Sequence, residues 1–140
     1  MYSKTIRGFT LIEAMIVLFI IGILATIAYP SYVSYLLKSH RSDAMATLAQ
    51  NQITLERCYA QNFSYNQTCS FLPTFPQTSA KGYYNITLTN LSASTYTLTA
   101  TAIGRQTEDT ICALFIIDQA NVKTAADSSG ATQTLCWNPT

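Results

Sequence analysis

Residues 9–29 read FTLIEAMIVLFIIGILATIAY, and this stretch decides the class of the protein. Its 21 residues carry one charged side chain, Glu13. As an α-helix rising about 1.5 Å per residue, the stretch is long enough to cross the hydrocarbon core of a bilayer. Lys4 and Arg7 precede it and are expected on the cytoplasmic side by the positive-inside rule. The sequence therefore predicts a membrane helix.

The apolar stretch is predicted to stay in the protein after export. An ordinary secretory signal ends in a small-residue cleavage site just after its apolar run. The segment ATIA at 25–28 matches such a site poorly, and the helical pattern continues beyond Pro30.

Glu13 is the unusual residue of this helix. A carboxylate inside hydrocarbon costs about 3 kcal/mol on insertion scales and therefore needs a partner. The neighbouring sequence supplies no basic side chain on the membrane side. Cleavage between Gly8 and Phe9 would create an α-amino group, which is mostly protonated at neutral pH because its pKa is about 8.

Residues 7–13, RGFTLIE, resemble the class III signal of type IV prepilins and of type II secretion pseudopilins. In that family a prepilin peptidase cuts after the glycine and N-methylates the new first residue. A glutamate is then the fifth residue of the processed chain. The resemblance therefore implies cleavage after Gly8, methylation of Phe9 and a role for Glu13 in assembly.

Two residues are expected to weaken the helix. Pro30 lacks a backbone donor and clashes with the preceding turn, so we predict a kink there, with Gly22 as a second weak point. Together they form either a region that can bend or stretch in a filament, or breaks of the kind that membrane helices tolerate. Pro30 also stands where the family often has a helix-kinking proline. The short leader and the YPSY segment at 29–32 are similar to those of type IVa, PilE-like minor pilins.

Residues 31–62 are predicted to form an amphipathic second half of the same helix, because no Gly or Pro interrupts them. Apolar side chains recur there at spacings of three, four and seven, which is a helical stripe. The stripe consists of Val33, Leu37, Ala44, Leu48, Leu55 and Cys58. The charged side chains expected mostly off it are Lys38, Arg41, Asp43 and Glu56. We therefore expect the helix to leave the lipid and to pack this stripe on a head domain.

The head begins after Asn62 with a loop rich in Pro, Ser and Thr. Strands are predicted at 83–88, 96–102 and 112–118, with a hairpin loop at 90–94. Short turns between them imply an antiparallel meander with one face on the helix and the other in solvent.

The predicted fold class is therefore α+β. A long N-terminal α-helix, membrane-embedded in its first half, packs against a small antiparallel β-sheet with a disulfide-bonded C-terminal loop, as in the pilin fold. The predicted divisions are a leader at 1–8, a transmembrane or filament-core helix at 9–30, the amphipathic half of the helix at 31–62, and the globular head at 63–140.

Four cysteines in a small exported chain predict two disulfides and an oxidising compartment. Three connectivities are possible. The pairs Cys58–Cys69 and Cys112–Cys136 are favoured, because each alternative would tie the end of the helix to distant strands. The family resemblance supports the second pair, which would enclose the C-terminal loop known as the D-region in pilins.

Charge and motifs argue against several function classes. The net charge is +1, and no polybasic block exists, which disfavours tight nonspecific nucleic-acid binding. Phosphate-loop, zinc-protease and nucleophile-elbow motifs are absent from the sequence. We therefore predict that the protein is not an enzyme and that it has no catalytic residue, no cofactor and no metal.

His40 is expected to pack or lie at the surface. Glu108, Asp109 and Asp118 are expected to be solvated turn charges rather than a cation site.

The resemblance implies a structural subunit of a type IV pilus that polymerises through its N-terminal helix and supports adhesion, twitching motility or DNA uptake. The implied partners are other pilin subunits, the prepilin peptidase, the pilus assembly platform of the inner membrane, and membrane lipid before assembly. The precursor and subunit pool would lie in the bacterial inner membrane, and the filament would be extracellular.

Two alternatives stay open. Pseudopilins of type II secretion share the leader, but the major ones usually lack disulfides and carry a calcium-binding C-terminal loop. A DNA-binding minor pilin of natural transformation would need a basic stripe on the head. Besides Lys38 and Arg41 on the helix, the cations available for one are Arg57, Lys81, Arg105 and Lys123.

Overall fold

The computed structural model describes residues 8–67, 69 and 71–138. Lys4, Arg7 and most of the predicted leader lie outside these residues. The chain divides into two units, Met1–Tyr35 and Leu36–Thr140, and each unit is considered by itself. One helix, α1 (Leu11–Asn62), runs through both and ends where the sequence predicts the head to begin.

Within the first unit, the described chain is helical from Leu11, and its apolar side chains are exposed from Phe9 to Tyr32. The helix continues through Gly22 and Pro30 without an interruption. A Cβ added at Gly22 would meet no heavy atom within 4 Å, so no packing contact in the described chain requires a glycine there. The kink at Pro30 stays a prediction.

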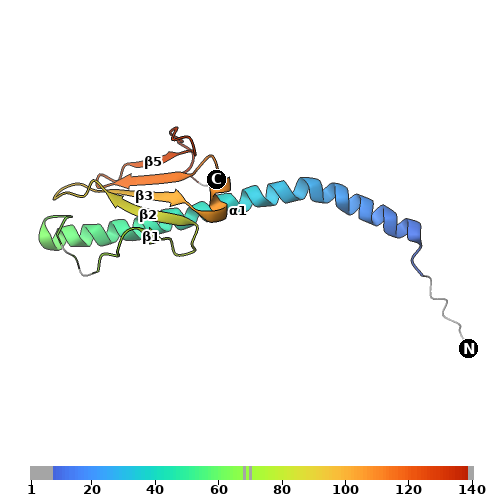
Figure 1. The fold of residues 1–140 in the computed structure, drawn as a ribbon, viewed down its shortest axis with the longest axis horizontal. Coiled ribbons are helices and arrows are strands. Elements are labelled where there is room, and N and C mark those ends of the chain that lie inside the picture. Colours follow the sequence, from blue (N-terminus) through green and yellow to red (C-terminus); the bar gives the residue numbers. More distant parts are fainter. Residues whose placement is uncertain (1–7, 68, 70, 139–140) are drawn as a thin grey trace, which may run out of the picture. The chain divides into compact units, whose positions relative to one another are not determined.

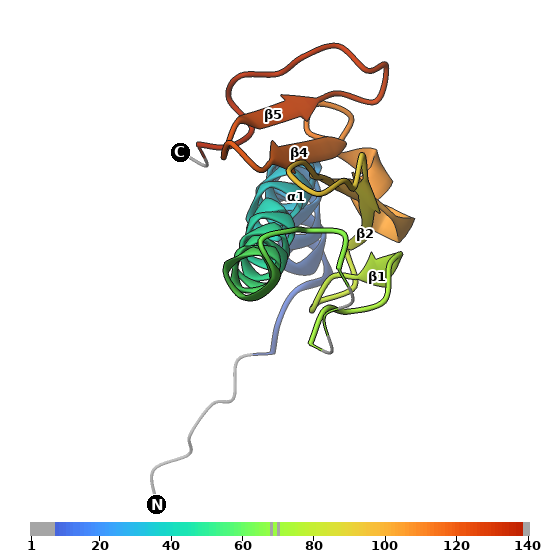
Figure 2. The ribbon, with the colours of Figure 1, turned by 90° about the vertical axis from the view of Figure 1, so that its left-hand side faces the viewer.

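The second unit packs a five-stranded antiparallel sheet on the remaining part of α1, as Figures 1 and 2 show. The strands are β1 (Gln77–Thr78), β2 (Tyr84–Thr89), β3 (Thr97–Ala102), β4 (Leu114–Asp118) and β5 (Lys123–Ala126). Their order in the sheet follows the chain, from β1 to β5. The predicted α+β architecture with an antiparallel meander is therefore confirmed.

The register of the central strands explains the core. Ile86 pairs with Ala100, and Ala100 pairs in turn with Phe115, so one buried row crosses β2, β3 and β4. Alternate residues point to opposite faces of a strand, so this row packs on the helix while the intervening threonines face outward. The helix contributes Ala44, Leu48, Leu55 and Cys58 to the same core, as its apolar stripe predicts.

The prediction of three strands missed β1 and β5. Neither strand shows alternating apolar side chains: β1 has two residues, and β5 reads KTAA. Both are added to the edges of the sheet by pairing with β2 and β4. Their strand conformation therefore depends on a neighbouring strand and not on a local pattern.

The prediction that Asp43 lies off the buried stripe is wrong. This residue is buried on α1, where Ser79 Oγ donates to its Oδ2 at 2.6 Å and Lys81 N donates to its Oδ1 at 3.2 Å. Ser79 Oγ also accepts from Tyr84 N at 3.0 Å. The hydrogen bonds to Asp43 thus hold the turn between β1 and β2 against the helix.

A second polar cluster holds the 3₁₀ helix Gly104–Glu108 and the residue after it against α1. Arg41 donates two hydrogen bonds to Asp109, from Nε at 2.7 Å and from Nη2 at 2.9 Å. The side chains of this ion pair are only 11% and 4% exposed. Asp109 is therefore a buried partner of the helix, and the expectation of a solvated turn charge is wrong for it.

His40 packs beside this ion pair. Its Nδ1–H donates to Gln106 Oε1 at 3.0 Å, and its ring stacks on Tyr83 with 3.6 Å between ring centroids. Gln106 Nε2 donates to the Tyr84 hydroxyl at 3.0 Å. Every member of the cluster has a partner, which is the condition for a buried polar network to stabilise a fold.

Two disulfides complete the head. Cys58 at the end of α1 is joined to Cys69 in the following loop, and Cys112 before β4 is joined to Cys136. The second bridge encloses the C-terminal loop with β4 and β5. These are the two pairs that the sequence favoured.

Candidate functional site

The N-terminal end of α1 brings together the residues implied in processing and assembly. Thr10 precedes the first helical residue and accepts a hydrogen bond from Glu13 N through its Oγ1 at 3.3 Å. This is one half of a Thr-x-x-Glu capping box, a signal in residues 10–13 that the sequence reasoning overlooked. Glu13 therefore lies in the first turn, where the helix dipole favours a negative side chain.

Beyond this cap, α1 presents an apolar surface without partners in the described chain. Leu11 is 79% exposed, as is Phe9 just before the cap, and large aliphatic side chains remain exposed to Ile27. Among the described residues, α1 is the helix that is long and apolar enough to cross a membrane. A contiguous exposed apolar surface of this kind marks a contact with a membrane or with another protein.

The far end of α1 carries a tyrosine cluster around a carboxylate. The hydroxyls of Tyr65 and Tyr96 donate to Glu56 Oε1 at 3.1 and 3.0 Å. The two rings meet edge to face, and Tyr59 stacks on Tyr65. This cluster joins the end of the helix to the first residues of the head and to the start of β3.

Alkaline pH is expected to unfold the head through these tyrosines. Burial, followed by the hydrogen bond to Glu56, raises the pKa of Tyr65 from 10.0 to about 12. The pKa of Tyr96 is also raised, first by burial and then by the hydrogen bond to Glu56. In the unfolded chain both phenols ionise near pH 10, so stability is complete below that pH and falls as the pH rises toward 12.

A phenolate absorbance titration, read together with circular dichroism, checks this expectation. Glu56→Gln keeps an acceptor but removes the charge, so phenolate formation should begin at lower pH than in the wild type. The opposite finding would be that all nine tyrosines ionise near pH 10 while the head stays folded.

The cations of the head are dispersed. Residues 36–140 contain six Lys and Arg (8 − 2) and six Asp and Glu (7 − 1), so this unit has no net charge. Arg41 is paired with Asp109, Arg105 lies 3.6 Å from Glu108, and the Lys123 ammonium lies 5.4 Å from the centre of the Trp137 ring. Arg57 and Lys81 are exposed and form no ion pair within the described residues.

Two family models match the chain. The model of the prokaryotic N-terminal methylation motif matches residues 3–29, which include Gly8, Phe9 and Glu13. The model described as "Type IV minor pilin ComP, DNA uptake sequence receptor" matches residues 30–116, more than half of the chain.

Curated relatives match mainly through the helix. The type IV major fimbrial protein FimA of Dichelobacter nodosus is 50% identical over 52 residues, which are 37% of this chain and 33% of that protein. The type IV major alpha-pilin of Moraxella bovis is 36% identical over 89 residues, which are 64% of this chain and 51% of that protein. The chain thus matches between a third and about half of the length of these two relatives.

A solved structure shares the fold. The crystal structure of the non-core minor pilin PilV of Neisseria meningitidis superposes with a TM-score of 0.55 at 21% identity, over 70% of this chain and 94% of that one. The pilin fold predicted from the sequence is therefore confirmed. With the methylation motif at its N-terminus and the larger model covering the rest of α1 and most of the sheet, the chain belongs to the type IV minor pilin ComP family.

Proposed function

We propose that this chain is a structural subunit of a type IV pilus, held in the membrane by the first half of α1 and polymerised through the same helix. The observation that carries the proposal is the exposed apolar helix that lies within the match to the methylation motif. Lipid covers this surface before assembly, and the helices of neighbouring subunits cover it in the filament. No chemistry is required of the head, so the chain is a building unit and not an enzyme.

Gly8 and Phe9 are the processing site in this proposal. A prepilin peptidase cuts between them and methylates the new amino group of Phe9. Gly8 has no side chain, so the peptidase can approach the backbone closely. Gly8 and Phe9 lie before the capped first turn of α1, where the chain is exposed.

Glu13 then sets the position of each subunit along the filament axis. Its carboxylate pairs with the methylated amine of Phe9, either of a neighbouring subunit or of its own chain. A subunit at the wrong position along the filament axis leaves the carboxylate of Glu13 and the amine of Phe9 unpaired in an apolar core. Gly22 and Pro30 supply a region of α1 that can bend or stretch during this transfer.

Gly8→Val is expected to leave an uncut precursor in the inner membrane and to remove the subunit from sheared filaments. Intact-mass analysis of the wild-type filament should find a chain that begins at Phe9 and is one methyl group heavier than calculated. Gly22→Val is the matched control, because it introduces the same side chain in open space and should be cleaved normally. A processed chain that begins at Ala28 or later would contradict the proposal.

The proposal places the subunit pool in the inner membrane and the filament outside the cell. Its partners are other pilin subunits, the prepilin peptidase and the assembly platform. The two disulfides favour a pilus over a type II secretion pseudopilin, because the major pseudopilins usually lack such bridges.

DNA uptake is a second candidate function, and the family match over residues 30–116 favours it. The zero net charge of residues 36–140 limits a DNA interface to a few exposed cations such as Arg57 and Lys81. Binding of a short duplex at several salt concentrations separates the candidates. Two or three phosphate contacts give a slope of log K against log salt of about −2 to −3, and a purely structural subunit gives no binding.

A further inference from the structure

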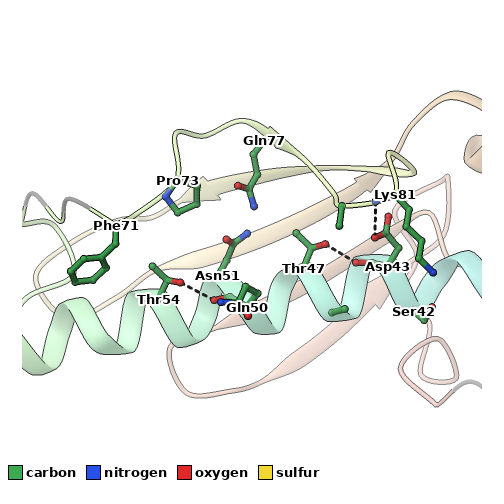
Figure 3. A pocket seen from close by; sticks show the side chains of 12 residues that line it. Ser42, Asp43, Thr47, Gln50, Asn51, Thr54, Phe71, Pro73, Gln77 and Lys81 are labelled. Carbon is green, nitrogen blue, oxygen red and sulfur yellow. Dashed lines mark hydrogen bonds between the residues drawn. The ribbon is translucent and has the colours of Figure 1, made fainter.

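A groove on the head lies between α1 and the chain that follows it, and its volume is about 650 Å³ (Figure 3). Thr47, Gln50, Asn51 and Thr54 line it from the helix. Phe71, Pro73 and Gln77 line it from the opposite side. We call it the helix–loop groove. Its volume is within the range of small-molecule sites, and the predicted processing, assembly and disulfide residues lie elsewhere in the chain.

Asn51 is the residue that suggests a ligand. Its side chain is only 3% exposed, and its Nδ2 is the one buried side-chain polar atom in the described part of the chain without a hydrogen-bond partner. Figure 3 shows its amide directed from α1 toward the segment that carries Gln77. Leaving such a donor unsatisfied is unfavourable, so it binds either water or a ligand with an acceptor oxygen.

The threonines beside Asn51 supply the complementary groups. Thr47 Oγ1 donates to the carbonyl of Asp43 at 2.8 Å, and Thr54 Oγ1 donates to the carbonyl of Gln50 at 2.9 Å. Because each hydroxyl hydrogen is used within the helix, each oxygen retains lone pairs that can accept a bond from a ligand. The amides of Gln50 and Gln77 can both donate and accept.

The charges at one end of the groove favour a neutral ligand. Both carboxylate oxygens of Asp43 accept hydrogen bonds from the turn, and the side chain of Lys81 is exposed. With one carboxylate and one ammonium, the lining has no net charge, so it selects neither a phosphate nor a metal cation.

The apolar part of the lining narrows the ligand class further. The Phe71 ring is 48% exposed and lies at the end of the groove opposite Lys81, as Figure 3 shows. A sugar ring has a C–H face that packs on an aromatic ring and hydroxyls that both donate and accept hydrogen bonds. A bound peptide strand would instead need a long free strand edge, and β1 has only two residues.

We propose that the helix–loop groove binds a neutral saccharide, with Asn51 donating to a sugar oxygen and Phe71 packing on a sugar ring. The hydroxyl oxygens of Thr47 and Thr54 accept from the sugar hydroxyls along the same helix face. The site lies wholly within the unit Leu36–Thr140 and does not depend on the proposed function.

The test is a titration of the ¹⁵N-labelled full chain with maltose, lactose and N,N′-diacetylchitobiose, followed by NMR. The chain is held in phosphocholine micelles, because sugar-based detergents would compete for the groove. At least one saccharide at about 50 mM, enough to fill most of a millimolar site, should shift the side-chain NH₂ signals of Asn51. The shifts should be saturable and insensitive to salt, because no ion pair is formed.

Asn51→Leu, followed through the backbone amide signals of Thr47 and Thr54, should weaken this binding at least tenfold while keeping the fold, since it removes an unpaired buried donor. Phe71→Ala changes an exposed ring and should also weaken it at least tenfold. Gln61→Leu is the matched control: it makes a similar polar-to-apolar change on an exposed part of α1 outside the groove and should bind as the wild type does.

Three results would overturn the proposal. The first is that none of the three saccharides moves the Asn51 signals, which assigns the donor to bound water. The second is that a short oligonucleotide moves them in a salt-dependent way, which assigns the groove to nucleic acid. The third is that they move only with protein concentration, which assigns the groove to a second copy of the chain.

Discussion

Glu13→Ala subunits are expected to be cleaved and inserted normally but to enter filaments about a hundredfold less than the wild type. The amine at Phe9 would then lie in the filament core without its partner, and an unpaired buried charge costs about 3 kcal/mol or more. The cap of α1 does not explain this loss, because Thr10 Oγ1 bonds the backbone amide of residue 13, which alanine retains. Quantitative mass spectrometry of sheared filaments, from cells with no other copy, measures the effect.

Two variants separate charge from helix capping. Glu13→Gln keeps the shape and hydrogen-bonding capacity of the side chain but loses the charge, so its incorporation should lie between alanine and wild type. Thr10→Val removes the capping hydroxyl, which is worth about 1 kcal/mol to the helix, yet keeps the charge and should assemble nearly as the wild type does. Wild-type incorporation of Glu13→Ala would refute the proposed pairing of Glu13 with the Phe9 amine.

Asp109→Ala is expected to destabilise the head by about 3–5 kcal/mol, which lowers its melting temperature by roughly 15 °C. The change leaves the guanidinium of Arg41 buried and unpaired on α1, where it is now held by two hydrogen bonds of 2.7 and 2.9 Å. It also removes the acceptor for the amide of Cys112, which lies 3.3 Å from Asp109 Oδ1. Thermal unfolding of the oxidised full chain, followed by circular dichroism, measures the loss.

The exposed pair Arg105–Glu108 provides the control for this experiment. Its side chains are 72% and 54% exposed, and their closest atoms are 3.6 Å apart. Glu108→Ala should therefore change stability by no more than about 0.5 kcal/mol. The double variant Arg41→Met with Asp109→Asn should recover most of the loss, because neither side chain then carries a buried charge. Equal losses for Asp109→Ala and Glu108→Ala would show that burial of the pair is unimportant.

The sequence by itself determined the elements whose pattern is local. Residues 9–29 are strongly apolar and long enough for a bilayer, so composition alone predicted a helix with an apolar surface there. The stripe from Ala44 to Cys58 and the alternation in β2 and β3 predicted which faces are buried, because each depends only on the helical or strand period. The Thr-x-x-Glu cap at residues 10–13 could have been found in the same way.

Only the tertiary structure decided which polar residues are buried and which segments form the edge strands of the sheet. Asp109 looks like a turn charge until the fold brings it to Arg41, 68 residues earlier in the chain. Asp43 is buried because the turn at Ser79 supplies donors for its carboxylate, and β1 and β5 are strands because β2 and β4 offer them an edge. Asn51 has no such partner in its groove. A buried polar group is stable only with a partner, and a partner far along the chain leaves no local pattern in the sequence.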